Sequence, residues 1–389
     1  MKMDLELLSA VLFYLFLLLF FYRNRKKVKV ISKVVLGYKT RKGISFMRKI
    51  AKHRALCKLV STVYIPIALY FTFVVSSQLI LNTYFILTKK IGPTVALVVP
   101  GVRIPGSPIF FPFWYTIISI AILAVIHEFS HGIVALSERI RVKDAGFGLF
   151  LVFFLAFVEP HEGDMKRSSR LSRIRVASAG PVSNLLTALL IGGLLLSLDP
   201  FLSNFFSYEG VKIVKVMEGY PAQEAGLKDG MVILGLENFT TQNITSFSEA
   251  LSNFKPNQTI KVLTNEGEFN LTLTGSPQNE SVPYMGIYLS QAWSFKEQFL
   301  GRLFYVLFGL PYFRMGTYDK GLLGWLALLS FFVGVVNLLP TFALDGGIIV
   351  YNLLSYFIRD EKRLNLVCSS IFYFFLTLLV FNIVGPYFL

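Results

Sequence analysis

The chain has 389 residues, 54% of them hydrophobic and 16% charged, with a mean hydropathy of +0.59. Long charge-free runs exclude a large soluble protein and predict an integral membrane protein. The net charge is 38 − 23 = +15. In membrane proteins such an excess gathers in cytoplasmic loops, so we expect a lipid bilayer and no nucleic acid as partner.

The first apolar run, Leu5–Tyr22, is just long enough to span a membrane and is not followed by a small-residue cleavage site. We therefore expect a retained anchor. Arg23–Arg54 is dense in Lys and Arg and is expected to be a solvated cytoplasmic loop. The two cysteines, Cys57 and Cys368, lie at or inside apolar runs and indicate no disulfide framework.

Five further apolar runs are long enough to be spans. They are Leu59–Thr88, Phe111–Leu136, Val176–Leu198, Gly321–Leu344 and Leu364–Leu389. The pattern predicts a polytopic α-helical protein with about six spans, both termini outside, and a charged cytoplasmic loop at Arg359–Arg363. Two shorter apolar runs predict re-entrant elements: a hairpin or strand pair at Ala145–Val158, and an interfacial or re-entrant helix at Leu303–Phe313.

A polar segment, Glu209–Leu289, interrupts the spans and shows the period-2 alternation of strands. It predicts a small α/β module. The expected strands are Val211–Val216, Met231–Leu234, Thr259–Thr264 and Phe269–Thr274, with a helix at Ser246–Phe254 and a hairpin turn at Asn265–Glu268. Glycosylation sequons agree with an external location; they begin at Asn238, Asn243, Asn257, Asn270 and Asn279.

These patterns divide the chain into four parts. We expect an anchor with its basic loop in residues 1–56, a membrane region in 57–200, the external module in 208–291 and a second membrane region in 292–389.

The third apolar run contains His127-Glu128-Phe129-Ser130-His131. Residues four apart share one face of a helix, so His127 and His131 can hold one zinc ion. Glu128 stands beside them, where a carboxylate can take a proton from metal-bound water. Such groups within a membrane-length helix are costly unless they face an interior or a wet cavity.

Hydrolytic zinc usually has three protein ligands and one water. Asp345 is one candidate for the third, and the Glu159/His161/Glu162 cluster is the other. Counted along their helices, His127 and Asp345 both fall in the cytoplasmic half of a core about 30 Å thick, whereas the cluster is shallower. The depth favours Asp345. Asn184 is expected to serve helix packing, with a hydrogen bond across helices.

These motifs resemble the site-2 protease family of intramembrane zinc metalloproteases. The resemblance rests on His127–His131, on Gly180-Pro181 with Asn184, and on Asn337, Pro340 and Asp345-Gly346, in that order. It implies His127, His131 and Asp345 as ligands, Glu128 as general base and Asn337 as a contact for an unwound substrate strand.

The external module is similar to a PDZ-like domain of the protease-associated kind, on the signature Pro221–Gly230. Such domains accept an extended peptide or a carboxyl terminus at a strand edge. Residues 1–90 do not match the minimal core of the protease family.

The sequence predicts a zinc metalloendopeptidase that cuts single-span membrane proteins in or near their spans. We expect it in the cell membrane, with the active site toward the cytoplasm and the PDZ-like module outside. One alternative is a membrane-anchored zincin that cuts cytosolic peptides, with Glu159 or Glu162 as third ligand. A metal transporter or a PDZ scaffold is a non-enzymatic alternative.

Overall fold

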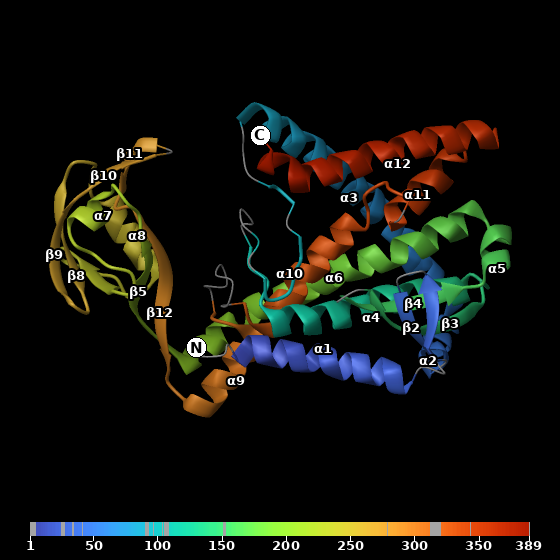
Figure 1. Cartoon of the computed structure of the whole chain (residues 1–389), viewed down its shortest axis with the longest axis horizontal. Coiled ribbons are helices and arrows are strands. Elements are labelled where there is room, and N and C mark those ends of the chain that lie inside the picture. Colours follow the sequence, from blue (N-terminus) through green and yellow to red (C-terminus); the bar gives the residue numbers. More distant parts are fainter. Residues whose placement is uncertain are drawn as a thin grey trace. The chain divides into compact units, whose positions relative to one another are not determined.

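The computed structural model describes residues 5–24, 28–32, 35–40, 42–89, 93–95, 97–102, 104, 109–150, 153–277, 279–311, 320–342 and 344–388. Two compact units divide the chain (Figure 1). The first joins residues 1–194 to 322–389 and contains the histidine motif, and the second comprises residues 195–321. The 303–313 prediction lies partly outside the described residues.

Helices dominate the first unit, because the apolar runs of the sequence satisfy their backbone hydrogen bonds internally. They are α1 Leu5–Arg23, α2 Lys42–Ala51, α3 Arg54–Lys89, α4 Phe113–Ser137, α5 Glu162–Arg167, α6 Arg170–Leu202, α10 Gly321–Val336, α11 Asp345–Leu354 and α12 Glu361–Val384, with a short 3-10 turn at Gly385–Tyr387. Four of them, α3, α4, α6 and α12, are long and apolar enough to cross a membrane. The described parts of α1 and α10 hold shorter apolar stretches, so the count of six spans stays a prediction.

The basic segment 23–54, expected to be a solvated loop, contains regular structure, and that expectation was wrong. It forms two antiparallel strands, β1 Val28–Ser32 and β2 Val35–Thr40, followed by α2. The buried residues of α2 are Ile44, Met47 and Ala51, spaced three and four apart as in an amphipathic helix. Ile44 and Met47 pack in one apolar cluster with residues of α4, which stabilises this helix within a strongly basic segment.

The run Gly321–Leu344 is not one continuous helix. It is helical only to Val336, and Asp345 begins α11 rather than ending a span. Pro340 lies in the break, where its ring and missing N–H are incompatible with a helix interior.

The predicted loop Arg359–Arg363 is also partly helical. The Asp360 side chain accepts a hydrogen bond from the Arg363 backbone N–H at 2.7 Å. This N-cap starts α12 at Glu361, within the charged stretch.

The Ala145–Val158 prediction of a strand pair is confirmed. Strands β3 Val142–Phe150 and β4 Phe153–Pro160 are antiparallel, and β2 pairs with the other edge of β3. The sheet order is β1-β2-β3-β4, so β4 is a terminal strand of the sheet. Strand β4 packs against α4, the helix of the histidine motif (Figure 1).

The second unit is built mainly of antiparallel strands. They are β5 Phe206–Val216, β6 Val232–Leu236, β7 Phe239–Thr240, β8 Thr259–Thr264, β9 Gly267–Thr272, β10 Thr274–Ser276, β11 Asn279–Tyr284 and β12 Ile287–Phe295. The main sheet has the order β12-β5-β6-β8-β9, with β7 beside β6, and β10 and β11 form a separate ribbon. The short segments are η1 Ser203–Phe205, α7 Pro221–Glu224, α8 Ile244–Ser252 and α9 Gln298–Phe308.

The predicted elements of the module are present, with shifted ends. Helix α8 starts at Ile244 because the Asn243 side chain caps it in a reciprocal pair with Ser246. Strands β8 and β9 form the expected hairpin, and its turn is tighter than predicted because Thr264 pairs directly with Gly267. The sheet extends past the predicted boundary at residue 291, to Phe295.

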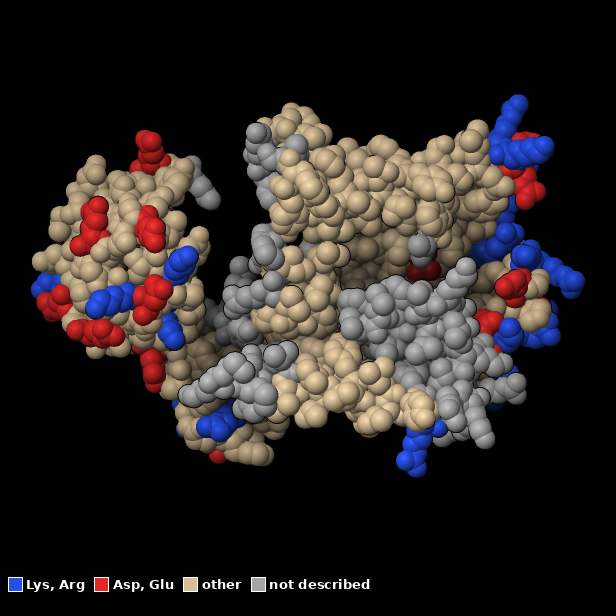
Figure 2. Space-filling view, viewed as in Figure 1, with Lys and Arg blue, Asp and Glu red and all other residues tan. Residues whose placement is uncertain are grey.

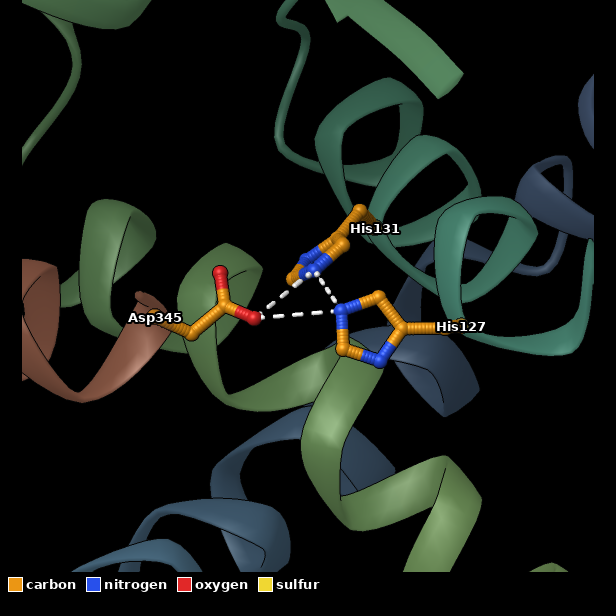
Figure 3. Close-up of side chains that lie close together, drawn as sticks. All are labelled: His127, His131 and Asp345. Carbon is orange, nitrogen blue, oxygen red and sulfur yellow. Dashed lines mark hydrogen bonds and ion pairs between the residues drawn. The ribbon is translucent and has the colours of Figure 1, made fainter. Parts of the chain in front are cut away.

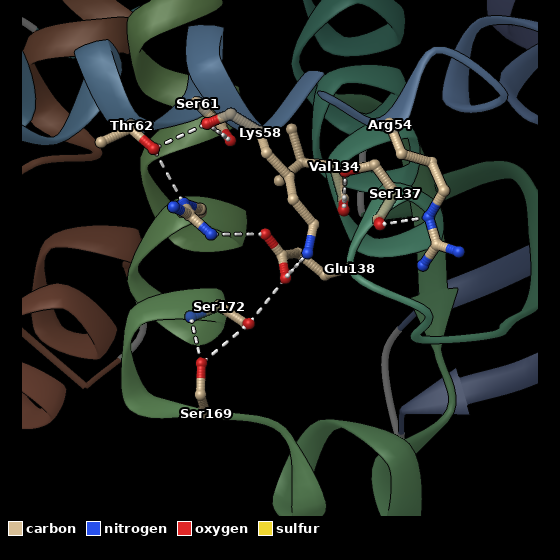
Figure 4. Close-up of polar contacts among 10 residues, drawn as sticks. Arg54, Lys58, Ser61, Thr62, Val134, Ser137, Glu138, Ser169 and Ser172 are labelled. Carbon is tan, nitrogen blue, oxygen red and sulfur yellow. Dashed lines mark hydrogen bonds and ion pairs between the residues drawn. The ribbon is translucent and has the colours of Figure 1, made fainter. Parts of the chain in front are cut away.

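An ionic cluster joins α3, α4 and α6 (Figure 4). The Glu138 carboxylate accepts hydrogen bonds from Ser172 Oγ at 2.7 Å and from Arg175 Nη1 at 2.9 Å, and Lys58 Nζ lies at 3.3 Å. Burial raises the pKa of Glu138, but these hydrogen bonds and the Lys58 charge outweigh it and hold the pKa below its usual range. The cluster therefore ties together three helices around a paired, buried charge.

Charge is unevenly distributed over the first unit. On the face that Figure 2 shows, Lys and Arg gather around α5 and around the connection between α11 and α12, with Asp and Glu among them, while the surface of the apolar helices between shows few charges.

Candidate metal centre

Helix α4 places two imidazoles on one face, one turn apart. His127 Nε2 and His131 Nε2 lie 3.1 Å from each other (Figure 3). The two side chains are 11% and 12% exposed, so both rings are withdrawn from the surface.

A carboxylate from a distant part of the chain completes the group. Asp345 Oδ2 lies 3.1 Å from His127 Nε2 and 3.3 Å from His131 Nε2. The turn before α11 folds tightly back on itself, and the Gly346 N–H donates to the Asn337 carbonyl at 2.8 Å. A Cβ at Gly346 or Gly347 would collide with carbonyl oxygens of this turn, so the two glycines allow the fold that delivers Asp345.

The three ligand atoms lie within 4.8 Å of one another, close enough to share one ion. Two imidazole nitrogens and one carboxylate oxygen form a three-ligand set of the kind that catalytic zinc uses, with a fourth position open. Gly180 of α6 supports the fit: a Cβ there would lie 2.6 Å from His127 Nε2 and would also collide with His131 Nε2. The absence of a side chain at Gly180 keeps the ligand atoms accessible, and the donor set fits a metal ion.

The Nδ1 atom of each imidazole has a partner of its own, which leaves Nε2 for a metal ion. His131 Nδ1 donates to the Val176 carbonyl oxygen at 2.6 Å. His127 Nδ1 lies 3.2 Å from Asn184 Nδ2, and Asn184 Oδ1 is buried with no partner among the described residues. Exchanging the two amide atoms makes Oδ1 the acceptor for His127 Nδ1–H and leaves Nε2 for a metal. Asn184 thus bonds across helices, as expected, and its partner is a candidate ligand.

Glu128 lines the same hollow as the three candidate ligands, a space of about 460 Å³. Its Oε2 accepts a hydrogen bond from the Val158 N–H of β4 at 2.9 Å, which fixes the carboxylate at the wall. Asn337 also lines the hollow, and its side chain donates to the Val333 carbonyl of α10. The structure therefore brings all five predicted site residues to one place.

The competing ligand cluster has other partners. Glu159 Oε1 lies 2.8 Å from Lys143 Nζ, and His161 Nδ1 caps α5 by accepting from the Asp164 N–H. Among the described residues, the one group of three that is compact enough for a metal ion is His127, His131 and Asp345.

The sequence analysis did not single out two further groups at the hollow. One is the Val158 N–H, a backbone group without a signature of its own. The other is Arg173, which lines the hollow. Arg173 has arginine neighbours at 170 and 175, and their spacing does not show which arginine lines the hollow.

The fold and the site define an integral membrane protein with a buried His–His–Asp centre beside a glutamate. The model of Peptidase family M50 matches residues 115–379, more than half of the chain. The chain belongs to this family, and membership implies a zinc metalloprotease. This agrees with the resemblance to site-2 proteases.

Two individual relatives are each 26% identical to this chain in sequence. An uncharacterized protein of Methanocaldococcus jannaschii is 26% identical over 370 residues, which cover 93% of this chain and 89% of that protein. A protein of Streptococcus pyogenes serotype M3, provisionally named a zinc metalloprotease, is 26% identical over 230 residues, or 51% of this chain and 54% of its own length. Among solved structures, the PDZ domain of an SdrC-like protein from Listeria monocytogenes is 23% identical; it covers 21% of this chain and 90% of that domain, with a TM-score of 0.20.

Proposed function

We propose that this protein is an intramembrane metalloprotease that hydrolyses a peptide bond in or near a span of another membrane protein. One observation carries the proposal. The His–His–Asp group and Glu128 meet in one hollow, and the histidines belong to a helix of membrane-spanning length. A soluble-type site on a membrane anchor has no need of this arrangement.

Each residue has a distinct role in this proposal. His127, His131 and Asp345 hold zinc, and the chemistry that zinc supplies in such a site is Lewis acidity toward water and the scissile carbonyl. Glu128 accepts the proton of the attacking water and passes it to the leaving amine. The Val158 N–H orients Glu128 for this transfer.

A helical substrate hides its carbonyl groups in its own hydrogen bonds and must unwind before it is cut. Strand β4 is a terminal strand beside the hollow, so an unwound segment can pair with it and recover part of that cost. Asn337, which also lines the hollow, binds the same segment in this proposal. These features favour single-span membrane proteins as substrates.

The same proposal assigns an orientation. The lysines and arginines around α5 face the cytoplasm, and the second unit lies outside the cell membrane. There, as a PDZ-like module, it binds an extended peptide or a carboxyl terminus, which brings a substrate to the protease.

Zinc content tests the metal centre without any substrate. Purified wild type should hold about one zinc per chain, and His127→Ala and Asp345→Ala should each lose it or bind it much more weakly. Retention of zinc by Asp345→Ala at wild-type affinity would contradict the proposed ligand set.

Cleavage tests the reaction. The protein is reconstituted with a panel of single-span membrane proteins, and the products are sequenced by mass spectrometry. Wild type should cut within or beside a span, and Glu128→Gln should keep zinc but lose cleavage by several orders of magnitude. Full cleavage by zinc-loaded Glu128→Gln would show that the mechanism is wrong.

A further inference from the structure

One positively charged side chain in the wall of the hollow has no role in the proposed hydrolysis. Arg173, on the first turns of α6, is the one lysine or arginine among the described residues that line it. The other charged side chains on this wall, apart from the histidines, are Glu128 and Asp345. An arginine at a site of this kind is costly unless its donors are used.

Among the described residues, Arg173 has a single hydrogen-bond acceptor for its donors. Its Nη2 donates to the Ser168 carbonyl at 3.3 Å, a long hydrogen bond. Its Nε is buried and has no partner among the described residues. A guanidinium offers five N–H donors in a planar fork that matches a carboxylate. Most of this capacity has no acceptor among the described residues, and the side chain lines the hollow.

Two neighbouring arginines on the same helix show that this is particular to position 173. Arg175 is paired with Glu138 and also donates to Thr62 Oγ1 at 3.0 Å. Arg170 stacks over the Tyr356 ring, with Cζ 5.2 Å from the ring centroid. Neither of these side chains lines the hollow.

We propose that Arg173 binds a carboxylate of the peptide in the active-site hollow. The inference rests on the proposed function, because a proteolytic site is where such a peptide is held. Two sources share this chemistry: an acidic side chain near the cut bond, and the α-carboxylate that hydrolysis creates. In both, the fork of Arg173 pairs with the carboxylate oxygens, and the buried Nε gains its missing acceptor.

The test measures how strongly the charge of a probe is coupled to Arg173. One pair of probes is an apolar hexapeptide ending in a carboxylate or in a carboxamide. A second pair is an apolar peptide hydroxamate carrying one Asp or one Asn. Each is titrated by fluorescence polarisation into zinc-loaded full-length protein carrying Glu128→Gln, with or without Arg173→Gln.

For each pair, the ratio of the two dissociation constants is compared between the proteins with and without Arg173. Direct binding of a probe to zinc contributes equally to both proteins and cancels. A charge-assisted hydrogen bond corresponds to a change of about tenfold or more in this ratio. We expect such a change for at least one pair, and the pair that shows it identifies the source of the carboxylate.

Arg170→Gln is the matched control, since it removes the same charge from the same helix outside the hollow. It should change the ratio less than twofold, and Arg173→Lys should fall between wild type and Arg173→Gln because it keeps the charge but not the fork. Ratios unaffected by Arg173→Gln for both pairs, with zinc bound, would overturn the inference alone. If no probe binds the zinc-loaded protein at all, the proposed proteolytic site fails and the inference fails with it.

Discussion

Replacing Gly180 with alanine perturbs the metal centre without removing any proposed ligand. The new Cβ would lie 2.6 Å from His127 Nε2 and would also collide with His131 Nε2. Both rings, or α6 itself, must then shift. Such overpacking of a filled interior costs about 1–3 kcal/mol. Since about 1.4 kcal/mol is a factor of ten, we expect zinc affinity to fall by about 5- to 150-fold.

The assay is a competition between the protein and a chromophoric zinc chelator in detergent. Gly192→Ala is the control, because Gly192 lies on the same helix and a Cβ there meets nothing within 4 Å. Both substitutions improve helix propensity, so a loss confined to Gly180→Ala reports on the centre. Zinc affinity of Gly180→Ala within twofold of wild type would refute the proposal that the ion sits between these rings.

Three further predictions concern the surroundings of the centre. Asn184→Leu removes the hydrogen bond to His127 Nδ1 and should weaken zinc binding by about 10- to 100-fold with little effect on helix content. The same chelator competition measures the zinc affinity, and circular dichroism measures the helix content. Unchanged zinc affinity would exclude a positioning role for Asn184. Because the folded-state pKa of Glu138 is depressed, its stabilisation is complete above the unfolded pKa of about 4.3 and is lost as the pH falls through the folded value. The melting temperature should therefore drop below about pH 5, and less so in Glu138→Gln; parallel curves for the two proteins would disprove this account. Met47→Ala opens a cavity at a fully buried position and should lower the free energy of unfolding by about 2–5 kcal/mol in reversible denaturation, and a loss below about 1 kcal/mol would show that α2 contributes little.

The sequence was sufficient for the parts of the site that have a fixed spacing. His127 and His131 share a helix, so a four-residue interval places them together. Asp345 is 214 residues beyond His131, and its expected depth in the membrane favoured it over the 159–162 cluster. The structure brings Asp345 within 3.3 Å of the two histidine Nε2 atoms, at the start of a helix.

Other features were not predictable because they depend on which partner a side chain meets. A basic stretch indicates the side of the membrane, but it does not show that Arg175 is neutralised by Glu138 while Arg173 faces the hollow. For the same reason the Lys-rich segment 23–54 was expected to be a loop. Its alternating valines in β1 form a strand because β2 pairs with them, and β2 in turn pairs with β3.

The strands β1 and β2 and the helix α2 precede the residues that match the M50 family. They nevertheless support the frame of the centre, since the Met47 side chain packs closely on Gly132, the residue after His131. A chain trimmed to residues 115–379 would keep every proposed ligand, but it would lose β1 and β2, and β3 would become a terminal strand of the sheet in place of β1. The segment that supports the metal centre is therefore larger than the segment that matches the family model.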